Sequence, residues 1–175
     1  MPACLSKVGG GCMLPAVAAS ALPCIGGWAG SYAVRHNYSG WYTTLNKPKW
    51  TPPSYVFAPV WTTLYAGMGF ASYLVWRDGG GFNGVAKMPL MLYATQLALN
   101  WMWTPIFFSY HSIKWGLFDV GLLSVTAGCC AVAFHKVNQS AGLLMLPYLG
   151  WLGVATSLNY YIFQHNEIES KKEEE

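Results

Sequence analysis

Five long apolar segments constrain this chain more than any other feature of its sequence. They cover residues 13–34, 54–76, 88–109, 113–134 and 141–163. A helix needs about 20 residues to cross the hydrocarbon of a bilayer, and these segments lack the two-residue alternation of a barrel strand. In hydrocarbon, the backbone polar groups must pair within the segment, as they do in a helix. The pattern predicts an all-α integral membrane protein, a five-transmembrane-helix bundle.

Charged residues are scarce and clustered, as expected for a chain surrounded mostly by lipid. They make up 10% of the 175 residues, against roughly 25% in a typical soluble domain. The net charge is only +3, and no basic stripe suits nucleic acid, so we expect no nucleic-acid partner. Lysine and arginine are more numerous on the side that holds the C-terminus, which predicts a cytosolic C-terminus.

The five segments form one predicted domain, because the connections leave no room for a soluble module. We expect an N-terminal tail at residues 1–12, the transmembrane domain at 13–165 and a disordered charged tail at 166–175. The longest connection, 35–53, contains three prolines and several tryptophans and tyrosines. Such a composition favours an ordered lid over the bundle or a position among the lipid headgroups.

Small residues recur where neighbouring helices would have to touch. Gly26 and Gly30 form a G-x-x-x-G motif in the first segment, and Gly67 and Gly69 lie in the second. Small side chains allow two helix backbones to approach closely, either within one bundle or between protomers. Of these two uses, we expect packing within the bundle.

The stretch QLALNWMWTPIFF, residues 96–108, is unusually polar for a membrane segment. On a helix, Gln96, Asn100, Trp103 and Phe107 fall within one stripe roughly 60° wide. Because amides cannot face lipid cheaply, this stripe is expected to face the interior of the bundle. Pro105 removes one helix hydrogen bond and predicts a local kink.

Similar stripes on the other segments predict an aromatic pocket inside the bundle. Such a pocket suits a flat, largely apolar ligand with one or two polar edges. The stripes comprise Ala58, Trp61 and Tyr65; Trp115, Asp119 and Leu122; and Pro147, Trp151, Val154, Ala155 and Leu158. Aromatic residues near segment ends, namely Trp50, Trp76 and Tyr110, are expected in the headgroup belt instead. Asp119 fits either a proton or ion site or a structural hydrogen bond.

Residues for catalysis are few. His36, His111, His135 and His165 all lie in loops or at segment ends, so no axial haem ligand is expected within the membrane. No Ser-His-Asp set, paired carboxylates or phosphate-binding loop is visible. We therefore expect no catalytic residues, no metal site and no cofactor.

Three long blocks of sequence closely resemble the translocator protein family. The blocks are WYTTLNKPKWTPPSYVFAPVWTTLYAGMGFASYLVW, QLALNWMWTPIFF and LPYLGWLGVATSLNYYIF. This family includes the peripheral-type benzodiazepine receptor of animals and the tryptophan-rich sensory proteins of bacteria, and the third block resembles the animal branch. The resemblance implies a five-helix bundle in the mitochondrial outer membrane, often a homodimer in contact with membrane lipid. It also implies binding of cholesterol, of protoporphyrin IX or haem as a ligand rather than a cofactor, and of synthetic benzodiazepine-type ligands.

The resemblance also implies which residues would form the ligand site. The loop at 35–53 would close the pocket, Ser31 and Val34 would line its mouth, and the stripes above would add Tyr65 and Phe107. The motifs themselves contribute Ala58, Trp61, Asn100, Trp103, Trp115, Trp151, Ala155 and Leu158.

The cholesterol motif of the family's animal members, L/V-x-Y-x-K/R, is incomplete here. Leu158, Tyr160 and Tyr161 fit it, but Gln164 occupies the basic position. The inverted motif is matched by Lys114, Phe118 and Val120, and both patterns are weak predictors of sterol binding. Sterol binding through the last segment is therefore left open, whereas binding of porphyrins and drug-like ligands is unaffected.

The function expected from these observations is membrane ligand binding for sterols and tetrapyrroles, with a role in their transport or sensing. One alternative is a porphyrin-degrading enzyme, an activity attributed to bacterial relatives. A second alternative is a small exporter or channel, for which Asp119 is the one ionisable candidate within a span.

Overall fold

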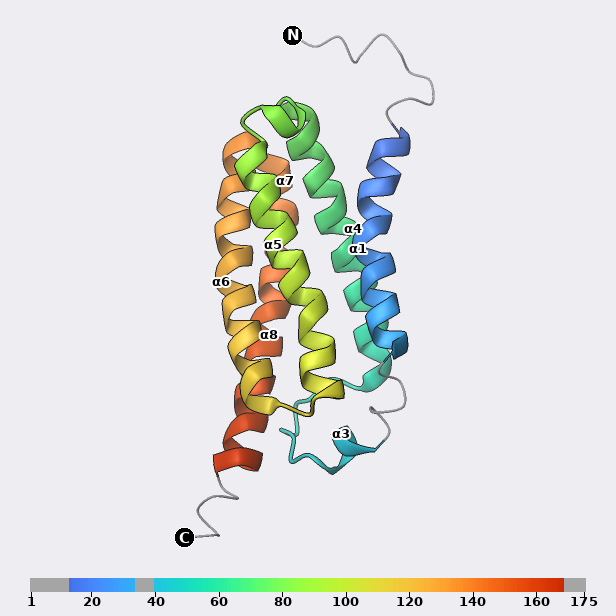
Figure 1. The fold of residues 1–175 in the computed structure, drawn as a ribbon, viewed down its shortest axis with the longest axis vertical. Helices are drawn as coiled ribbons and strands as arrows, with labels where there is room; N and C mark the ends of the chain where they lie inside the picture. Colours follow the sequence, from blue (N-terminus) through green and yellow to red (C-terminus); the bar gives the residue numbers. More distant parts are fainter. Residues whose placement is uncertain (1–12, 34–39, 169–175) are drawn as a thin grey trace.

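The computed structural model describes residues 13–33 and 40–168, and every regular element in these residues is helical. Five helices have 18 residues or more and run side by side as an elongated bundle (Figure 1): α1 (Met13–Ala33), α4 (Ser54–Asp78), α5 (Lys87–Thr104), α6 (Ile113–Val137) and α8 (Leu146–Phe163). The shorter elements are α3 (Trp41–Thr44), η1 (Gly81–Asn83), η2 (Pro105–Ser109), α7 (Gln139–Leu144) and η3 (Gln164–Ile168). The predicted all-α class is confirmed.

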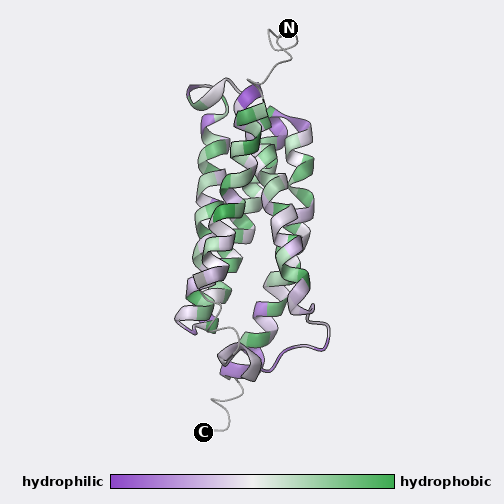
Figure 2. Cartoon of the chain, turned by 90° about the vertical axis from the view of Figure 1, so that its right-hand side faces the viewer, coloured by the Kyte–Doolittle hydropathy of each residue, from purple (hydrophilic) through white to green (hydrophobic). Residues whose placement is uncertain are grey.

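Three described segments are long and apolar enough to cross a membrane: Met13–Tyr32, Ile113–Val137 and Gln139–Glu167. The helices α4 and α5 are long enough but carry more polar residues, so the count of five spans stays a prediction. Large apolar side chains such as Phe118, Val125 and Val132 point outward from α6 and are 59–66% exposed. Strongly hydrophilic residues gather at the two ends of the bundle (Figure 2). This distribution is typical of a helix bundle in lipid.

The last predicted segment, 141–163, is divided into two helices. Asn138 begins α7, since its side-chain oxygen accepts a hydrogen bond from the Ala141 backbone N–H at 2.9 Å. The chain then turns at Met145, and α8 begins with Pro147 in its first turn. Proline has no N–H to continue the hydrogen-bond ladder but fits the first turn of a new helix.

Pro105 disrupts its helix as predicted. The regular part of α5 ends at Thr104, and residues 105–109 form the π-helical turn η2, in which the Tyr110 N–H donates to the Pro105 carbonyl at 3.1 Å. The wider turn changes the direction of the side chains that follow it.

The start of the predicted disordered tail is ordered. Residues 166–168 lie in η3, and Asn166 and Glu167 accept hydrogen bonds from the backbone of Asn46 and Lys114, respectively. Residues 1–12 and 169–175 lie outside the described residues.

Glycines set the distance between α1 and its neighbours, which confirms their use within the bundle at two positions. A Cβ atom added to Gly69 of α4 would lie 2.6 Å from the Ser20 Cα of α1, and one added to Gly26 would collide with the Trp101 indole. Gly30 and Gly67 have no such close neighbour among the described residues.

The core consists of two clusters stacked along the bundle axis. The larger one includes Met68, Val75, Leu123, Phe134 and Leu152. The smaller one lies where α3 covers the end of the bundle and is formed by Tyr42, Phe107, Phe108, Ile113, Leu158 and Ile162. Side chains that are only half-buried, including those of Trp61 and Trp103, border the two clusters.

We expect Gly69→Ala to lower the free energy of unfolding by about 1–3 kcal/mol, because the new methyl group would collide with the α1 backbone. Thermal unfolding of the detergent-solubilised protein measures this loss. Gly67→Ala is the matched control on the same helix, where an added Cβ meets nothing within 4 Å. Equal effects of the two substitutions would show that close approach of α1 and α4 does not matter for stability.

Candidate functional site

A buried chain of polar side chains links α4, α5 and α8 at the centre of the bundle. The Tyr65 hydroxyl donates to Asn100 Oδ1, Asn100 Nδ2 donates to the Tyr148 hydroxyl at 3.1 Å, and that hydroxyl donates to Gln96 Oε1 at 2.8 Å. Gln96 Nε2 ends the chain on Met68 Sδ at 3.7 Å. The four polar side chains are at most 8% exposed. The predicted inward orientation of Gln96 and Asn100 is confirmed, and both amides are bound by protein groups.

An aromatic cluster continues from this chain toward the covered end of the bundle. Trp103 stacks on Phe107 with ring centroids 4.9 Å apart and meets the edge of Phe108 at 5.8 Å. Beside the polar chain, Trp61 lies 5.4 Å from Tyr65. The polar chain thus contacts Trp61, and the smaller core cluster contacts Trp103.

The indoles of Trp61, Trp103 and Trp151 are half-buried, and the N–H groups of Trp103 and Trp151 have no partner among the described residues. Trp151 meets the edge of Phe57 at 5.7 Å, and its Nε1 is buried without a hydrogen bond to any described residue. Trp103 Nε1 is in the same condition. A buried N–H without an acceptor is unfavourable, so each is available to an acceptor on a ligand.

The loop that contains α3 covers the aromatic cluster, as predicted for a lid. The rings of Trp41 and Tyr42 lie 5.4 and 6.2 Å from Phe107. Farther along the loop, the Asn46 N–H donates to Asn166 Oδ1 at 2.8 Å, and Asn166 Nδ2 donates to the Asn46 carbonyl at 3.0 Å. Two hydrogen bonds therefore fasten the lid to η3.

The structure brings together most of the predicted ligand-site residues. The polar chain and the aromatic cluster contain Trp61, Tyr65, Asn100, Trp103 and Phe107, and Trp151 borders them. Leu158 is buried in the smaller core cluster, and Ala155 is half-buried one turn away.

Other predicted residues are exposed or lie outside the described residues. Ala58 and Ser31 have exposed side chains, and Val34 lies outside the described residues. Trp115 is 61% exposed and points outward beside Phe118, with ring centroids 5.9 Å apart.

In the sterol-motif region, Leu158 points inward but the residues after it do not form one face. Tyr160 is 57% exposed, Tyr161 stacks on His165 with centroids 3.8 Å apart, and Gln164 is exposed.

The predicted stripes on α6 and α8 are correct only in part, since Asp119 and Leu158 are buried but most of the other stripe residues are not. On α8 the other buried positions are Tyr148, Leu152, Asn159 and Ile162, about one residue away from the predicted positions Pro147, Trp151 and Val154. Asp119 of α6 is buried, but Trp115 and Leu122 of its predicted stripe are exposed.

The sequence analysis missed Tyr148, the centre of the polar chain. A tyrosine inside an apolar segment was a usable signal, because its hydroxyl needs a hydrogen-bond partner when buried. The sequence analysis also missed Phe57, whose ring meets Trp151.

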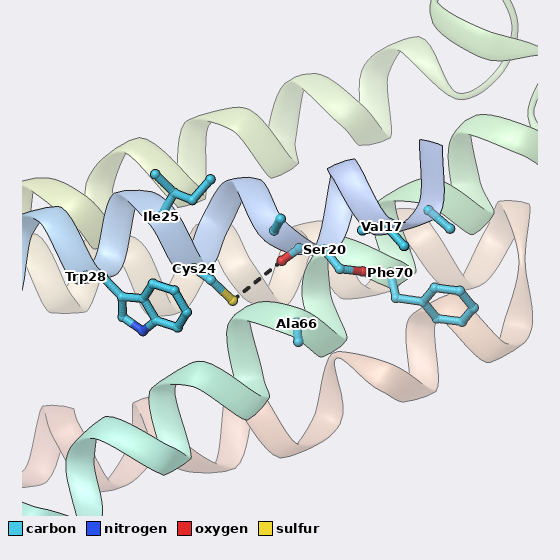
Figure 3. A pocket seen from close by; sticks show the side chains of 9 residues that line it. Val17, Ser20, Cys24, Ile25, Trp28, Ala66 and Phe70 are labelled. Carbon is cyan, nitrogen blue, oxygen red and sulfur yellow. Dashed lines mark hydrogen bonds between the residues drawn. The ribbon is translucent and has the colours of Figure 1, made fainter. Parts of the chain in front are cut away.

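A groove on the outside of the bundle is separate from this cluster (Figure 3). It has a volume of about 460 Å³ and lies between α1 and α4, lined by residues such as Val17, Cys24, Trp28, Ala66 and Phe70. Within α1, the Cys24 thiol donates a hydrogen bond to the Ser20 carbonyl at 3.5 Å, and both residues line the groove. Its lining is almost entirely apolar, so it fits lipid chains and does not supply the polar contacts of the interior cluster.

Comparison with known proteins gives a consistent family. The TspO/MBR family matches residues 19–165. The chain is 44% identical to the translocator protein of Bos taurus over 155 residues, which cover 89% of this chain and 92% of the relative. It is 45% identical to the Homo sapiens translocator protein, over 87% and 90% of the two chains. It is 41% identical to the tryptophan-rich protein TspO of Chlorobaculum tepidum, over 82% and 93%.

We expect Tyr148→Phe to lower the free energy of unfolding by about 1–3 kcal/mol. The substitution leaves the buried groups of Asn100 and Gln96 without a partner, which costs more than the loss of one ordinary hydrogen bond. Thermal unfolding measures the change, and Tyr160→Phe, at an exposed position of the same helix, is the control. A Tyr148→Phe protein as stable as the control would contradict the structural role of the chain.

We expect Asn166→Ala to loosen the lid, because both hydrogen bonds to the Asn46 backbone are lost. Amide hydrogen exchange of residues 40–53 should become several-fold faster. Gln164→Ala, at an exposed position of the same π-helical turn, should leave the exchange unchanged. If exchange in 40–53 is the same in the Asn166→Ala protein, the lid is held by other contacts.

Proposed function

Since the chain belongs to the TspO/MBR family, we propose that it is a membrane protein whose interior binds flat, largely apolar ligands. The proposed ligands are cholesterol, porphyrins such as protoporphyrin IX or haem, and synthetic benzodiazepine-type molecules. Binding would aid the transport or sensing of sterols and tetrapyrroles. The observation that supports this proposal best is the aromatic cluster under the lid, with its two unpartnered indole N–H groups.

The chemistry of the cluster suits a planar conjugated ring. Trp103 and Trp61 offer ring faces, while the Nε1 atoms of Trp103 and Trp151 offer donors to ligand acceptors. In the lid, Lys47 Nζ donates to the Tyr42 carbonyl at 2.7 Å and lies 4.3 Å from the Tyr42 ring centroid. A porphyrin with its ring in the cluster would direct its anionic propionates toward this cation.

The amides of Asn100 and Gln96 position the rings of the site, and their hydrogen-bonding groups are already used within the protein. Asn100 and Gln96 are engaged in the buried chain, which holds Tyr65 and Tyr148 against Trp61. The bovine and human relatives are named as translocator proteins, not as enzymes. We therefore propose a binding role without catalysis.

The proposal includes a location and an assembly. We propose the mitochondrial outer membrane, with the C-terminus in the cytosol, and a homodimer as the working form. The lysine and arginine distribution supports the orientation, and the location and the homodimer are what the resemblance of the sequence blocks to the translocator protein family implies.

We expect protoporphyrin IX to quench the tryptophan fluorescence of the purified protein saturably. Trp103→Ala should weaken this binding by about tenfold or more, equivalent to roughly 1.4 kcal/mol, because it removes a stacking face and a donor. Trp76→Ala is the matched control, since Trp76 lies at the other end of the bundle and packs on Tyr73.

The contrary outcome is quenching that is absent, or equally strong in the Trp103→Ala and Trp76→Ala proteins. If quenching is saturable and sensitive to Trp103→Ala, competition between cholesterol and protoporphyrin IX shows whether the two share a site.

A further inference from the structure

A second pocket lies at the corner between η2 and α6 and shares no lining residue with the aromatic cluster under the lid. Its volume is about 320 Å³, and it is lined by Ile106, Tyr110, Ser112, Trp115, Phe118 and Asp119. Trp115 and Phe118, which the first site does not use, both belong to this pocket.

Asp119 is the unusual member of the lining. Its side chain is only 6% exposed, and its Oδ2 is buried without a hydrogen-bond partner among the described residues. The one ion pair between described residues joins Arg77 and Asp78, at the opposite end of the bundle. Lys114 lies one turn earlier on α6, but its side chain is exposed and forms no bond with Asp119. A cation that can reach a carboxyl group in apolar surroundings strongly stabilises its ionised form.

The rest of the lining consists largely of aromatic rings that remain accessible. Tyr110, Trp115 and Phe118 are 77%, 61% and 63% exposed, respectively. An aromatic face attracts a cation by its quadrupole, and several rings around one acid form the type of site that recognises an ammonium group. A neutral hydroxyl would use the carboxyl oxygen but would gain little from the rings.

The surface beside the pocket fits an apolar chain. From Phe118, an outward line of exposed apolar residues continues along α6 through Leu122, Val125 and Val132. The pocket itself is near the beginning of α6, which starts at Ile113 after the Ser112 turn. A ligand with a charged head in the pocket could therefore extend its chain along α6 into the lipid.

We propose that this pocket binds the protonated amine of a membrane-dissolved amphiphile, with the Asp119 carboxylate as counter-ion and the rings of Tyr110, Trp115 and Phe118 around the ammonium group. The site is distinct from the one in the interior, and its ligand is distinguished from the flat ligands proposed there by its positive charge.

The test uses dodecylamine, a cation at neutral pH, and dodecanol, its neutral counterpart of equal chain length. The full-length ¹⁵N-labelled protein in detergent micelles is titrated with each, and the signals of the Trp115 indole N–H and of the amides of 112–120 are followed by NMR. We expect saturable shifts with dodecylamine and at least tenfold weaker binding of dodecanol. In Asp119→Asn, an isosteric change, dodecylamine should bind at least tenfold more weakly, and dodecanol should bind as before.

Asp78→Asn is the matched control, because it removes an exposed carboxylate at the far end of the bundle and leaves the total charge equal to that of Asp119→Asn. Dodecylamine should bind this control as it binds the unmodified protein. If Asp119→Asn does not fold, Trp115→Leu serves instead, since this exposed ring supports no core contact, and several-fold weaker dodecylamine binding is expected. Equal dodecylamine affinity in the pocket variant and the control, or equal affinity of the two probes, would overturn the proposal.

Discussion

The hydrogen bonds among Tyr65, Asn100, Tyr148 and Gln96 are the constraint on which the rest of the bundle depends. In lipid, helices gain little from burying apolar surface against one another, so polar side chains that bond across helices define how the helices meet. This chain joins α4, α5 and α8, and each of its amides would be costly in contact with lipid. The rings of Trp61 and Trp103 take their positions from helices that this network holds.

The sequence pattern was sufficient for the helical class and for the inward face of α5. Exposing the amides of Gln96 and Asn100 to lipid would cost so much free energy that the sequence of this one helix is enough to predict which face turns inward. On α6 and α8 the same reasoning failed, because almost every residue is apolar and the pattern does not distinguish a lipid-facing Trp115 from a buried one. The division at Met145 was missed for a related reason: Pro147 can begin a helix as well as bend one.

The two proposed sites differ in what holds them. The interior site consists of rings and donors fixed by neighbouring helices, with a lid fastened from above. The outer pocket has exposed rings and one buried acid, Asp119, that the protein leaves without a partner. In the two proposals, this TspO/MBR protein binds planar, largely apolar ligands and cationic amphiphiles at separate sites.

The fastening of the lid has a consequence for how the protein is made. Asn46 and Asn166 are 120 positions apart, and Asn166 follows the last long helix. During synthesis the first loop leaves the ribosome long before its partner exists. The two hydrogen bonds to Asn166 cannot form until the final helix has been made, so before that the lid has only its ring contacts with Phe107 and Phe108. Completion of the chain, rather than ligand arrival, is then the event that first fastens the lid over the aromatic cluster.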